Sequence, residues 1–382
     1  IESASAQAAD YKALVCLFQF GGADSNNMVV PDTDYAQYGL VRTAGSQVGI
    51  PQANLLTFTA SRQGGKSYGF HPSLQPLKDL YDQKKLAIVA NAGTLIAPIT
   101  MTEYKAGINR PPNLFSHSDQ QMLWQGLLPG EIVRTGWGGR LADKLASMNA
   151  GQKIPTMVSV SGTQVFNSGH DTRPFVIPGN GGVLLSGQGA DAVSTARYNA
   201  LRSLLGTGGG HKIFDGAASI LDKSLSAADA ANPYLTATLP ATIQTAFTVG
   251  GALLNTGLAN QLKQVARLIE ARGALGVKRQ VFMVNIGGWD THSNILTNQA
   301  NLFGISTNVT TFTMSDFNRT FIGNQTIGTD HAYGGNYLVM GGAVKGGDMY
   351  GTYPQLFLKG AEDTGSNGAW LPTTSVDQIG NT

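Results

Sequence analysis

The sequence has 382 residues and a net charge of +2, with no long run of Lys or Arg, so it lacks the basic footprint of a nucleic-acid-binding protein. No apolar run approaches the roughly 20 residues that a membrane-spanning helix needs. Only 13% of the residues are charged, about half the share typical of globular proteins, and the single cysteine, Cys16, leaves no intrachain disulfide.

The first ten residues favour an exported protein. They are rich in Ala and Ser, and Ala6-Gln7-Ala8 has the small-x-small pattern of a signal-peptidase site. We therefore expect residues 1–10 to be the end of an export signal and the protein to be periplasmic or extracellular. The alternative is a plain Ala/Ser tail.

The next part of the chain predicts a strand, a helix and a second strand. The segments ALVCLFQF at 13–20 and LAIVANAG at 86–93 are continuous apolar runs, which are typical of strands in a parallel sheet. Between them, leucines near helical spacing predict a helix within 72–85. This order indicates a βαβ unit.

The middle of the chain is predicted to be helical, and the last part to return to strands. Helices are expected at 189–206, 212–231 and 258–276, and the polar stretch 235–251 is interpreted as a loop. Further strands are expected at 156–162, 280–288, 308–316 and 337–344. The predicted fold is one α/β domain spanning 1–382, with a mainly parallel sheet and a helical insertion at 180–275.

Carboxylates and imidazoles recur after the predicted strands, where open parallel sheets bind their ligands. These residues are Asp24, Asn26 and Asn27, then Asp290 and His292, then Asp316 and Arg319, and finally Asp330 and His331. Taken together they predict a metal site. Each pair alone would equally suit a hydrogen-bonded Asp–His pair on the surface. Adjacent residues aim at different points, so Asp330 and His331 would serve two metals, or one would orient the other.

Ser116 has two interpretations. It precedes His117, and it stands where a helix is expected to begin, so it can be a plain helix N-cap. A serine at a helix N-terminus near a metal can also act as a nucleophile. No G-x-S-x-G motif accompanies it, which argues against an α/β-hydrolase triad.

Nine segments in order resemble a bacterial family of exported proteins called domain of unknown function 1501. They include ALVCLFQFGGADSNNMVVP, NLFSHSDQQMLWQG, RQVFMVNIGGWDTHSN and GTDHAYGGNYLVMGGAVKGG, and together they span almost the whole chain. Members of this family look like relatives of the alkaline phosphatase and sulfatase superfamily. The resemblance therefore implies an alkaline-phosphatase-like α/β/α sandwich and a metal-dependent hydrolase of phosphate or sulfate esters.

The resemblance also implies roles for individual residues. Ser116 would be the nucleophile, and Asn26, Asn27 and His117 would contact the substrate, an ester of a small molecule or glycan. One or two divalent metals (Zn, Mn or Mg, with Ca as a further option) would be bound by Asp24, Asp290, His292, Asp330 and His331. The reaction would be an in-line transfer of a phosphoryl or sulfuryl group.

Two departures from the family favour an alternative. Relatives commonly show paired histidines where this chain has Asn336-Tyr337, and they have a longer helical segment where 295–308 stands here. The alternative is a degenerate, non-catalytic member that acts as a surface or assembly component through self-association. A third option is a carbohydrate-binding module.

Overall fold

The structure is a computed structural model that describes residues 11–127, 134–207, 209–299 and 311–375. The predicted tail at 1–10 and the first residues of the strand expected at 308–316 lie outside these ranges. The chain forms two compact units. The larger unit contains Leu14–Trp137 and Met283–Thr382, and the smaller one contains Ile1–Ala13 and Gly138–Phe282.

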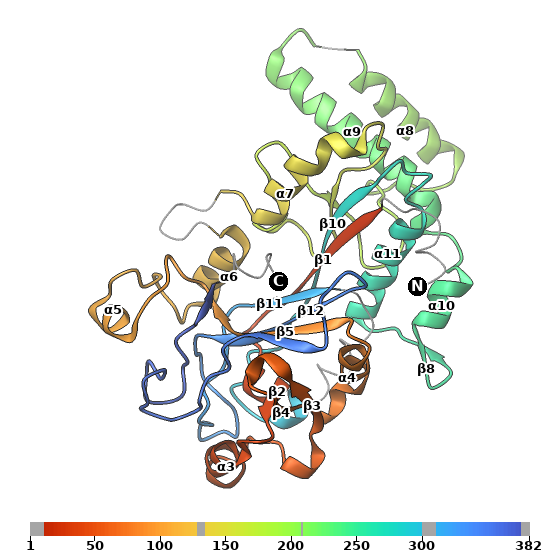
Figure 1. Cartoon of the computed structure of the whole chain (residues 1–382). Helices are drawn as coiled ribbons and strands as arrows, with labels where there is room; N and C mark the ends of the chain where they lie inside the picture. Colours follow the sequence, from red (N-terminus) through yellow and green to blue (C-terminus); the bar gives the residue numbers. More distant parts are fainter. Residues whose placement is uncertain (1–10, 128–133, 208, 300–310, 376–382) are drawn as a thin grey trace. The chain divides into compact units, whose positions relative to one another are not determined.

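The larger unit contains most strands of a mixed sheet and a second, three-stranded antiparallel sheet (Figure 1). Its main-sheet strands are β1 (Lys12–Gln19), β5 (Leu86–Gly93), β10 (Arg279–Ile286), β11 (Phe312–Ser315), β12 (Gly335–Met340), β13 (Asp348–Gly351) and β14 (Thr374–Ser375). The three strands of the smaller sheet are β2 (Val29–Pro31), β3 (Leu56–Ala60) and β4 (Lys66–Phe70). Its α-helices are α2 (Ser25–Met28), α3 (Tyr35–Tyr38), α4 (Gln75–Asp82), α5 (Met101–Ala106) and α6 (His117–Gly126), and Gly39–Gly45 forms a π-helix.

The main sheet is mostly parallel, as the apolar runs predict. Its strands lie in the order β13-β5-β12-β11-β1-β10, and β14 also pairs with β5. The pairs β1–β11, β13–β5 and β14–β5 are parallel, whereas β12 is antiparallel to both of its neighbours. All eight residues of β5 are buried, because this strand has a neighbour on each side. The α/β class with a mainly parallel sheet is confirmed.

The reversed direction of β12 has a direct consequence for the site. Because β12 runs antiparallel to β11, its first residues lie at the edge of the sheet where β1 and β11 end. Asp330 and His331, which come just before β12, therefore reach the same edge as residues that follow β1 and β11. A parallel β12 would have placed them at the opposite edge.

The core of the larger unit fills the space between the small sheet, α4 and β5. Leu77 and Tyr81 of α4 are buried in one cluster with Phe58, Phe70 and Ile88. The apolar spacing that predicts a helix within 72–85 is thus explained by packing, and the helix is confirmed at Gln75–Asp82.

The smaller unit is mainly helical. Its helices are α7 (Trp137–Leu145), α8 (Ala192–Leu205), α9 (Lys212–Leu235), α10 (Ala241–Ala246) and α11 (Gly257–Glu270). Its short strands are β6 (Met157–Ser159), β7 (Phe175–Val176), β8 (Thr248–Val249) and β9 (Ala252–Leu253). Strands β6 and β7 are parallel. Helices α8, α9 and α11 confirm the three predicted helices.

The interpretation of 235–251 as a loop is wrong. This stretch contains α10 and the start of a two-stranded hairpin, in which β8 pairs with β9 across Gly250 and Gly251. Both glycines have positive φ angles, 57° and 81°, which a tight hairpin turn requires. The elements were missed because six helical and two extended residues are too few to show a period.

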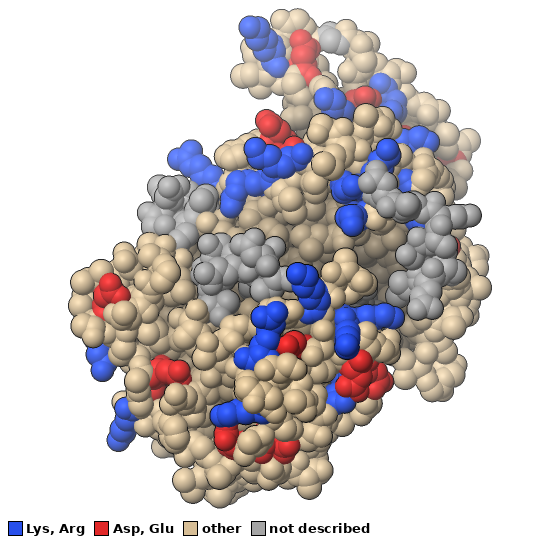
Figure 2. All heavy atoms as spheres, in the orientation of Figure 1, with Lys and Arg blue, Asp and Glu red and all other residues tan. Residues whose placement is uncertain are grey.

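The surface agrees with the low charge of the sequence. On the face shown in Figure 2, most atoms belong to residues other than Lys, Arg, Asp and Glu. Among the described helices, none has the length and apolar character that crossing a membrane requires. The division of the chain into one domain with an insertion at 180–275 stays a prediction.

Candidate metal centre

Three imidazoles converge on the carboxylate of Asp290 in the larger unit. The Nε2 atoms of His292 and His331 lie 3.0 Å and 3.5 Å from Asp290 Oδ1. The Nε2 atom of His117 lies 3.6 Å from Asp290 Oδ2. His292 and His331 are also close to each other, with 3.1 Å between their Nε2 atoms. These four side chains come from three places in the sequence: the first turn of α6, the loop after β10 and the loop before β12.

Each of the three imidazoles is oriented through its other ring nitrogen. His117 Nδ1 lies 2.7 Å from Asp316 Oδ2, and His292 Nδ1 lies 3.1 Å from Asp330 Oδ1. His331 Nδ1 lies 2.8 Å from the backbone carbonyl of Phe115, an acceptor only. A ring that carries its proton on Nδ1 donates to these oxygens, and its Nε2 then faces Asp290 as a free ligand atom. Metal-binding histidines are oriented in the same way.

Arg319 is the fixed positive charge of the cluster. Its guanidinium is completely buried and donates to Asp290 Oδ1, and its Nη1 lies 3.4 Å from His292 Nε2. Other hydrogen bonds of the guanidinium hold the backbone carbonyls of Gly21 and Gly22. Arg319 therefore links the turn after β1 to the cluster.

The electrostatics keep the Asp290 carboxylate charged. Burial raises its pKa, but the hydrogen bond and the charge of Arg319, with smaller contributions from His292 and His117, outweigh burial and leave the pKa below its usual value. Burial lowers the pKa of His331, which favours the neutral ring that a metal needs. With neutral imidazoles, Asp290, Asp316, Asp330 and Arg319 carry a net charge of −2, which attracts a divalent cation.

The donor atoms fit a metal in number, chemistry and spacing. Nitrogen and oxygen ligands about 2.1 Å from a tetrahedral Zn²⁺ are about 3.4 Å from one another. The distances among Asp290 Oδ1, His292 Nε2 and His331 Nε2 are 3.0, 3.1 and 3.5 Å. His117, Asp290 and His331 also offer ligand atoms that lie within 4.8 Å of one another. Two overlapping sets of three side chains therefore offer ligand atoms for one metal.

A close approach of two loops makes this geometry possible. Gly21 has a φ of 117°, and a Cβ atom at this position would lie 2.4 Å from the backbone nitrogen of Asp290. Any other residue would push the loop after β10 away from the turn after β1. Glycine at position 21 is thus required by the packing of the cluster.

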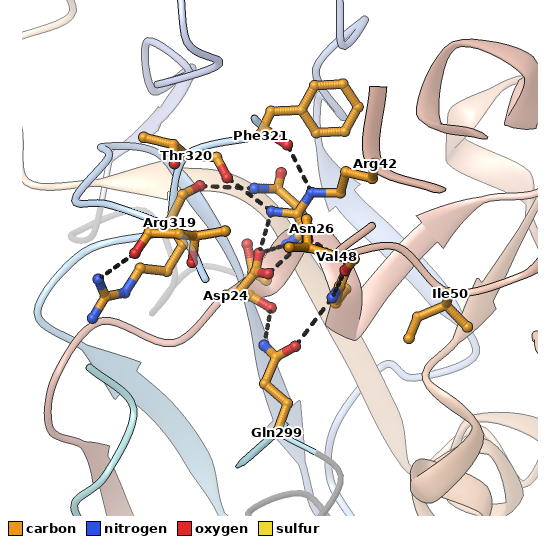
Figure 3. Close-up of polar contacts among 12 residues, drawn as sticks. Asp24, Asn26, Arg42, Val48, Ile50, Gln299, Arg319, Thr320 and Phe321 are labelled. Carbon is orange, nitrogen blue, oxygen red and sulfur yellow. Dashed lines mark hydrogen bonds and ion pairs between the residues drawn. The ribbon is translucent and has the colours of Figure 1, made fainter. Parts of the chain in front are cut away.

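The predicted site residues divide into two groups. Asp290, His292, Asp330 and His331 lie together, and His117, predicted as a substrate contact, lies with them. Asp24, Asn26 and Asn27 are buried outside this group, and Figure 3 shows Asp24 and Asn26 beside Arg42. Both oxygens of Asp24 face the guanidinium of Arg42, at 2.6 Å and 3.0 Å. The metal role of Asp24 and the substrate roles of Asn26 and Asn27 stay predictions.

Ser116 is the N-cap of α6, in agreement with the simpler of its two interpretations. Its hydroxyl accepts from the backbone nitrogen of Asp119 and lies 2.5 Å from Asp119 Oδ2. The serine is half-buried and directly precedes His117 in the chain. Its role as a nucleophile stays a prediction.

The Asn336-Tyr337 pair faces the interior of the larger unit. Asn336 contacts the backbone of Asn91 and Ser25, and the ring of Tyr337 packs against Trp124 with 4.7 Å between ring centroids. No contact joins either residue to His117, His292 or His331 among the described interactions. The Asn336-Tyr337 pair is therefore compatible with the arrangement of the four converging side chains.

Asp316, Arg319 and Arg42 are not among the site residues predicted from the sequence. Asp316 and Arg319 could have been found, because both follow a predicted strand and were noted there. Arg42 carried no signal, since it lies in a π-helix far from any predicted strand end. Only the folded chain shows its contact with Asp24.

A comparison with protein families identifies the chain. The family model described as "Protein of unknown function (DUF1501)" matches residues 11–308 and 304–369, so the chain belongs to this family. The two matched segments meet at 304–308, the end of the connection noted as short. No curated protein and no solved structure matches the chain significantly.

Proposed function

We propose that the protein is an exported, metal-dependent hydrolase of phosphate or sulfate esters with an alkaline-phosphatase-like fold. One observation supports this proposal: the Nε2 atoms of three imidazoles converge on one carboxylate, and each ring contacts an oxygen through Nδ1. A cluster that only stabilised the fold would not need three imidazoles, each held through Nδ1, around one carboxylate.

The metal would be held by Asp290, His292, His331 and His117. When bound, a divalent metal supplies positive charge that stabilises the oxygens of a phosphoryl or sulfuryl group during transfer. The residues are consistent with Zn or Mn, because imidazole nitrogen and carboxylate oxygen suit these metals. Asp316 and Asp330 would keep His117 and His292 in the orientation that binding needs.

Ser116 would be the nucleophile of this reaction. Its Oγ would form a bond to phosphorus or sulfur while the bond to the leaving oxygen breaks in line with the attack. The Ser116 proton would pass to Asp119 Oδ2, which lies 2.5 Å away, and the leaving oxygen would take a proton from water. The hydroxide left by that proton transfer would then attack the seryl ester, phosphate or sulfate would leave, and the proton held by Asp119 would return to Ser116 Oγ.

Two measurements test the proposal. The first is the metal content of protein purified without chelator, for which we expect about one or two equivalents of Zn or Mn that are lost in His331→Ala and retained in His170→Ala. The second is turnover of aryl phosphate and aryl sulfate. We expect Ser116→Ala to abolish it, whereas Thr100→Ala, which removes the comparable cap of α5, should leave it intact. Absence of bound metal, or equal activity in Ser116→Ala and wild type, would overturn the proposal that the protein is a hydrolase.

A second candidate function, a non-catalytic assembly component, is favoured by α8 and α9. None of the 14 residues of α8 is buried, and Ile213 and Ile220 of α9 are 78% and 70% exposed. These isoleucines lie seven residues apart and therefore share one helix face. A second copy of the chain would cover this face. If so, sedimentation should show an oligomer that Ile213→Ser/Ile220→Ser dissociates and His331→Ala does not; a wild-type monomer would exclude it.

A further inference from the structure

Arg42 is fully buried and uses its guanidinium to hold two adjacent carbonyls (Figure 3). Its Nη2 donates to the backbone oxygen of Thr320 at 2.9 Å, and its Nε donates to that of Phe321 at 3.0 Å. Asn26 Nδ2 holds the preceding carbonyl, that of Arg319, at 2.8 Å. Three consecutive carbonyls, 319–321, are therefore fixed by two side chains.

The segment 319–321 contains Arg319, and it supports Asp290 and His331 of the metal centre. Arg319 donates to Asp290, as described above. The segment also pairs with the chain before β12: Arg319 and His331 form an antiparallel bridge, and the backbone nitrogen of Thr320 donates to the Asp330 carbonyl at 2.9 Å. A shift of 319–321 would thus move Arg319 and His331 together.

Asp24 holds the Arg42 guanidinium in place. Its Oδ2 accepts from Nη1, and its Oδ1 accepts from Nη2 and from the backbone nitrogen of Asn26 at 3.1 Å. The Asp24 carboxylate has no exposed surface, and among the described contacts it reaches none of the three imidazoles. A buried charge without its partner is strongly destabilising, so the two side chains act as a unit.

We propose that Asp24 and Arg42 form a positioning pair for the metal centre, and that Asp24 acts through Arg42 instead of binding the metal. This inference rests on the proposed metal centre. The pair fixes 319–321, and 319–321 fixes Arg319 and His331. The residue that the family resemblance would make a metal ligand therefore has a different task in this chain.

The backbone that carries Arg42 supports this role. Arg42 lies in the π-helix Gly39–Gly45, and it is the buried residue of that element. π-Helical turns are rare and occur frequently at functional sites. Here the Arg42 side chain reaches the segment that carries Arg319.

Binding of Co²⁺, followed by its visible absorption spectrum, separates the two roles of Asp24. The variants are Asp24→Asn, Arg42→Lys, Arg42→Gln and the double variant Asp24→Asn/Arg42→Gln, in which both charges are removed so that neither is left unpaired. Asp290→Asn is the ligand control, and Lys66→Gln, which breaks a surface ion pair with Asp34, is the control without effect. Urea unfolding establishes that each variant is folded under the assay conditions.

A positioning pair predicts equal and non-additive effects. Arg42→Lys and Asp24→Asn should each weaken Co²⁺ binding by about 10- to 100-fold and change the spectrum, and the double variant should be no weaker than either single variant. If Asp24 is a ligand, Asp24→Asn will match Asp290→Asn while Arg42→Lys leaves the spectrum unchanged. That result would overturn the inference.

A second measurement works without metal. The Nε–H group of Arg319 donates to the Gly22 carbonyl at 2.9 Å in a buried position, so its proton should exchange slowly in a nuclear magnetic resonance experiment. We expect at least about tenfold faster exchange in Arg42→Lys and in Asp24→Asn. Unchanged exchange would contradict the positioning role. If the wild type binds no Co²⁺ and the variants still show faster exchange, the metal centre is refuted and the positioning role of Asp24 and Arg42 stands.

Discussion

His117 Nδ1 lies 2.7 Å from Asp316 Oδ2, although 199 residues separate them in the chain. Asp316 has no exposed surface, and the same oxygen accepts from Gln121 and from the backbone nitrogen of Gly21. This one carboxylate therefore joins the first turn of α6, the end of β11 and the turn after β1. It also fixes which nitrogen of His117 faces Asp290.

Replacing Asp316 should weaken the metal centre without removing a ligand. In Asp316→Asn the amide can turn its NH₂ group toward Nδ1 of His117, which favours the other tautomer and places a proton on Nε2. We expect about 10- to 100-fold weaker Zn²⁺ binding, measured by competition with a chelating dye. Asp34→Asn, at an exposed ion pair, should bind as the wild type does. Equal affinity in a folded Asp316→Asn would refute the orienting role.

His71 should make the stability of the protein fall between pH 6.5 and about 4. Burial lowers the pKa of His71 to about 4, and Nδ1 accepts a hydrogen bond from the backbone nitrogen of Ser73. Because the pKa in the folded state is below the ordinary value of 6.5, the unfolded chain takes up the proton first as the pH falls. The stabilisation is complete above pH 6.5 and is lost toward pH 4, by about 3 kcal/mol in total.

The measurement is the free energy of unfolding in urea at several pH values, for the wild type and His71→Gln. The variant should lose less stability than the wild type across this pH window. His170→Gln, which changes an exposed histidine, should follow the wild type. Parallel curves for wild type and His71→Gln would show that His71 titrates normally.

Gly21→Ala should destabilise the protein and disrupt the metal centre together. The substitution adds a Cβ atom 2.4 Å from the backbone nitrogen of Asp290, at a φ of 117°. Gly64→Ala is the matched control, because Gly64 also has a positive φ, 71°, but no heavy atom within 4 Å of the added Cβ. We expect the control to lose about 1–2 kcal/mol from backbone strain alone.

Gly21→Ala should lose more, about 3 kcal/mol or above, since overpacking is added to the strain. Thermal or urea unfolding measures both values, and Co²⁺ titration measures the centre. A Gly21→Ala protein as stable as Gly64→Ala, with unchanged Co²⁺ binding, would show that the two loops do not need their close approach.

Several elements could be predicted from the sequence because their signals are local. Apolar runs at 13–20 and 86–93 indicated buried strands, and β1 and β5 lie there. Helical spacing indicated α11, which buries Leu262 and Val265 on one face. The hairpin β8–β9 was missed, because two residues per strand are too few to show a period.

The candidate centre was predictable only in part. Its Asp and His residues stood out because they follow or precede apolar runs and lie beside glycines. The sequence could not separate Asp24 from Asp290, since both follow a predicted strand in a Gly-rich turn. In the structure, the nearest cation of Asp24 is Arg42, whereas Asp290 meets three imidazoles.

The sequence by itself determined the α/β class, the main buried strands and the residue types available for a metal, because these depend on local apolar patterns and on chemistry. Only the tertiary structure decided which of those residues meet. The antiparallel direction of β12 brings His331 to Asp290, and the π-helix brings Arg42 to Asp24. Both depend on contacts between segments far apart in the chain, and no local pattern encodes such contacts.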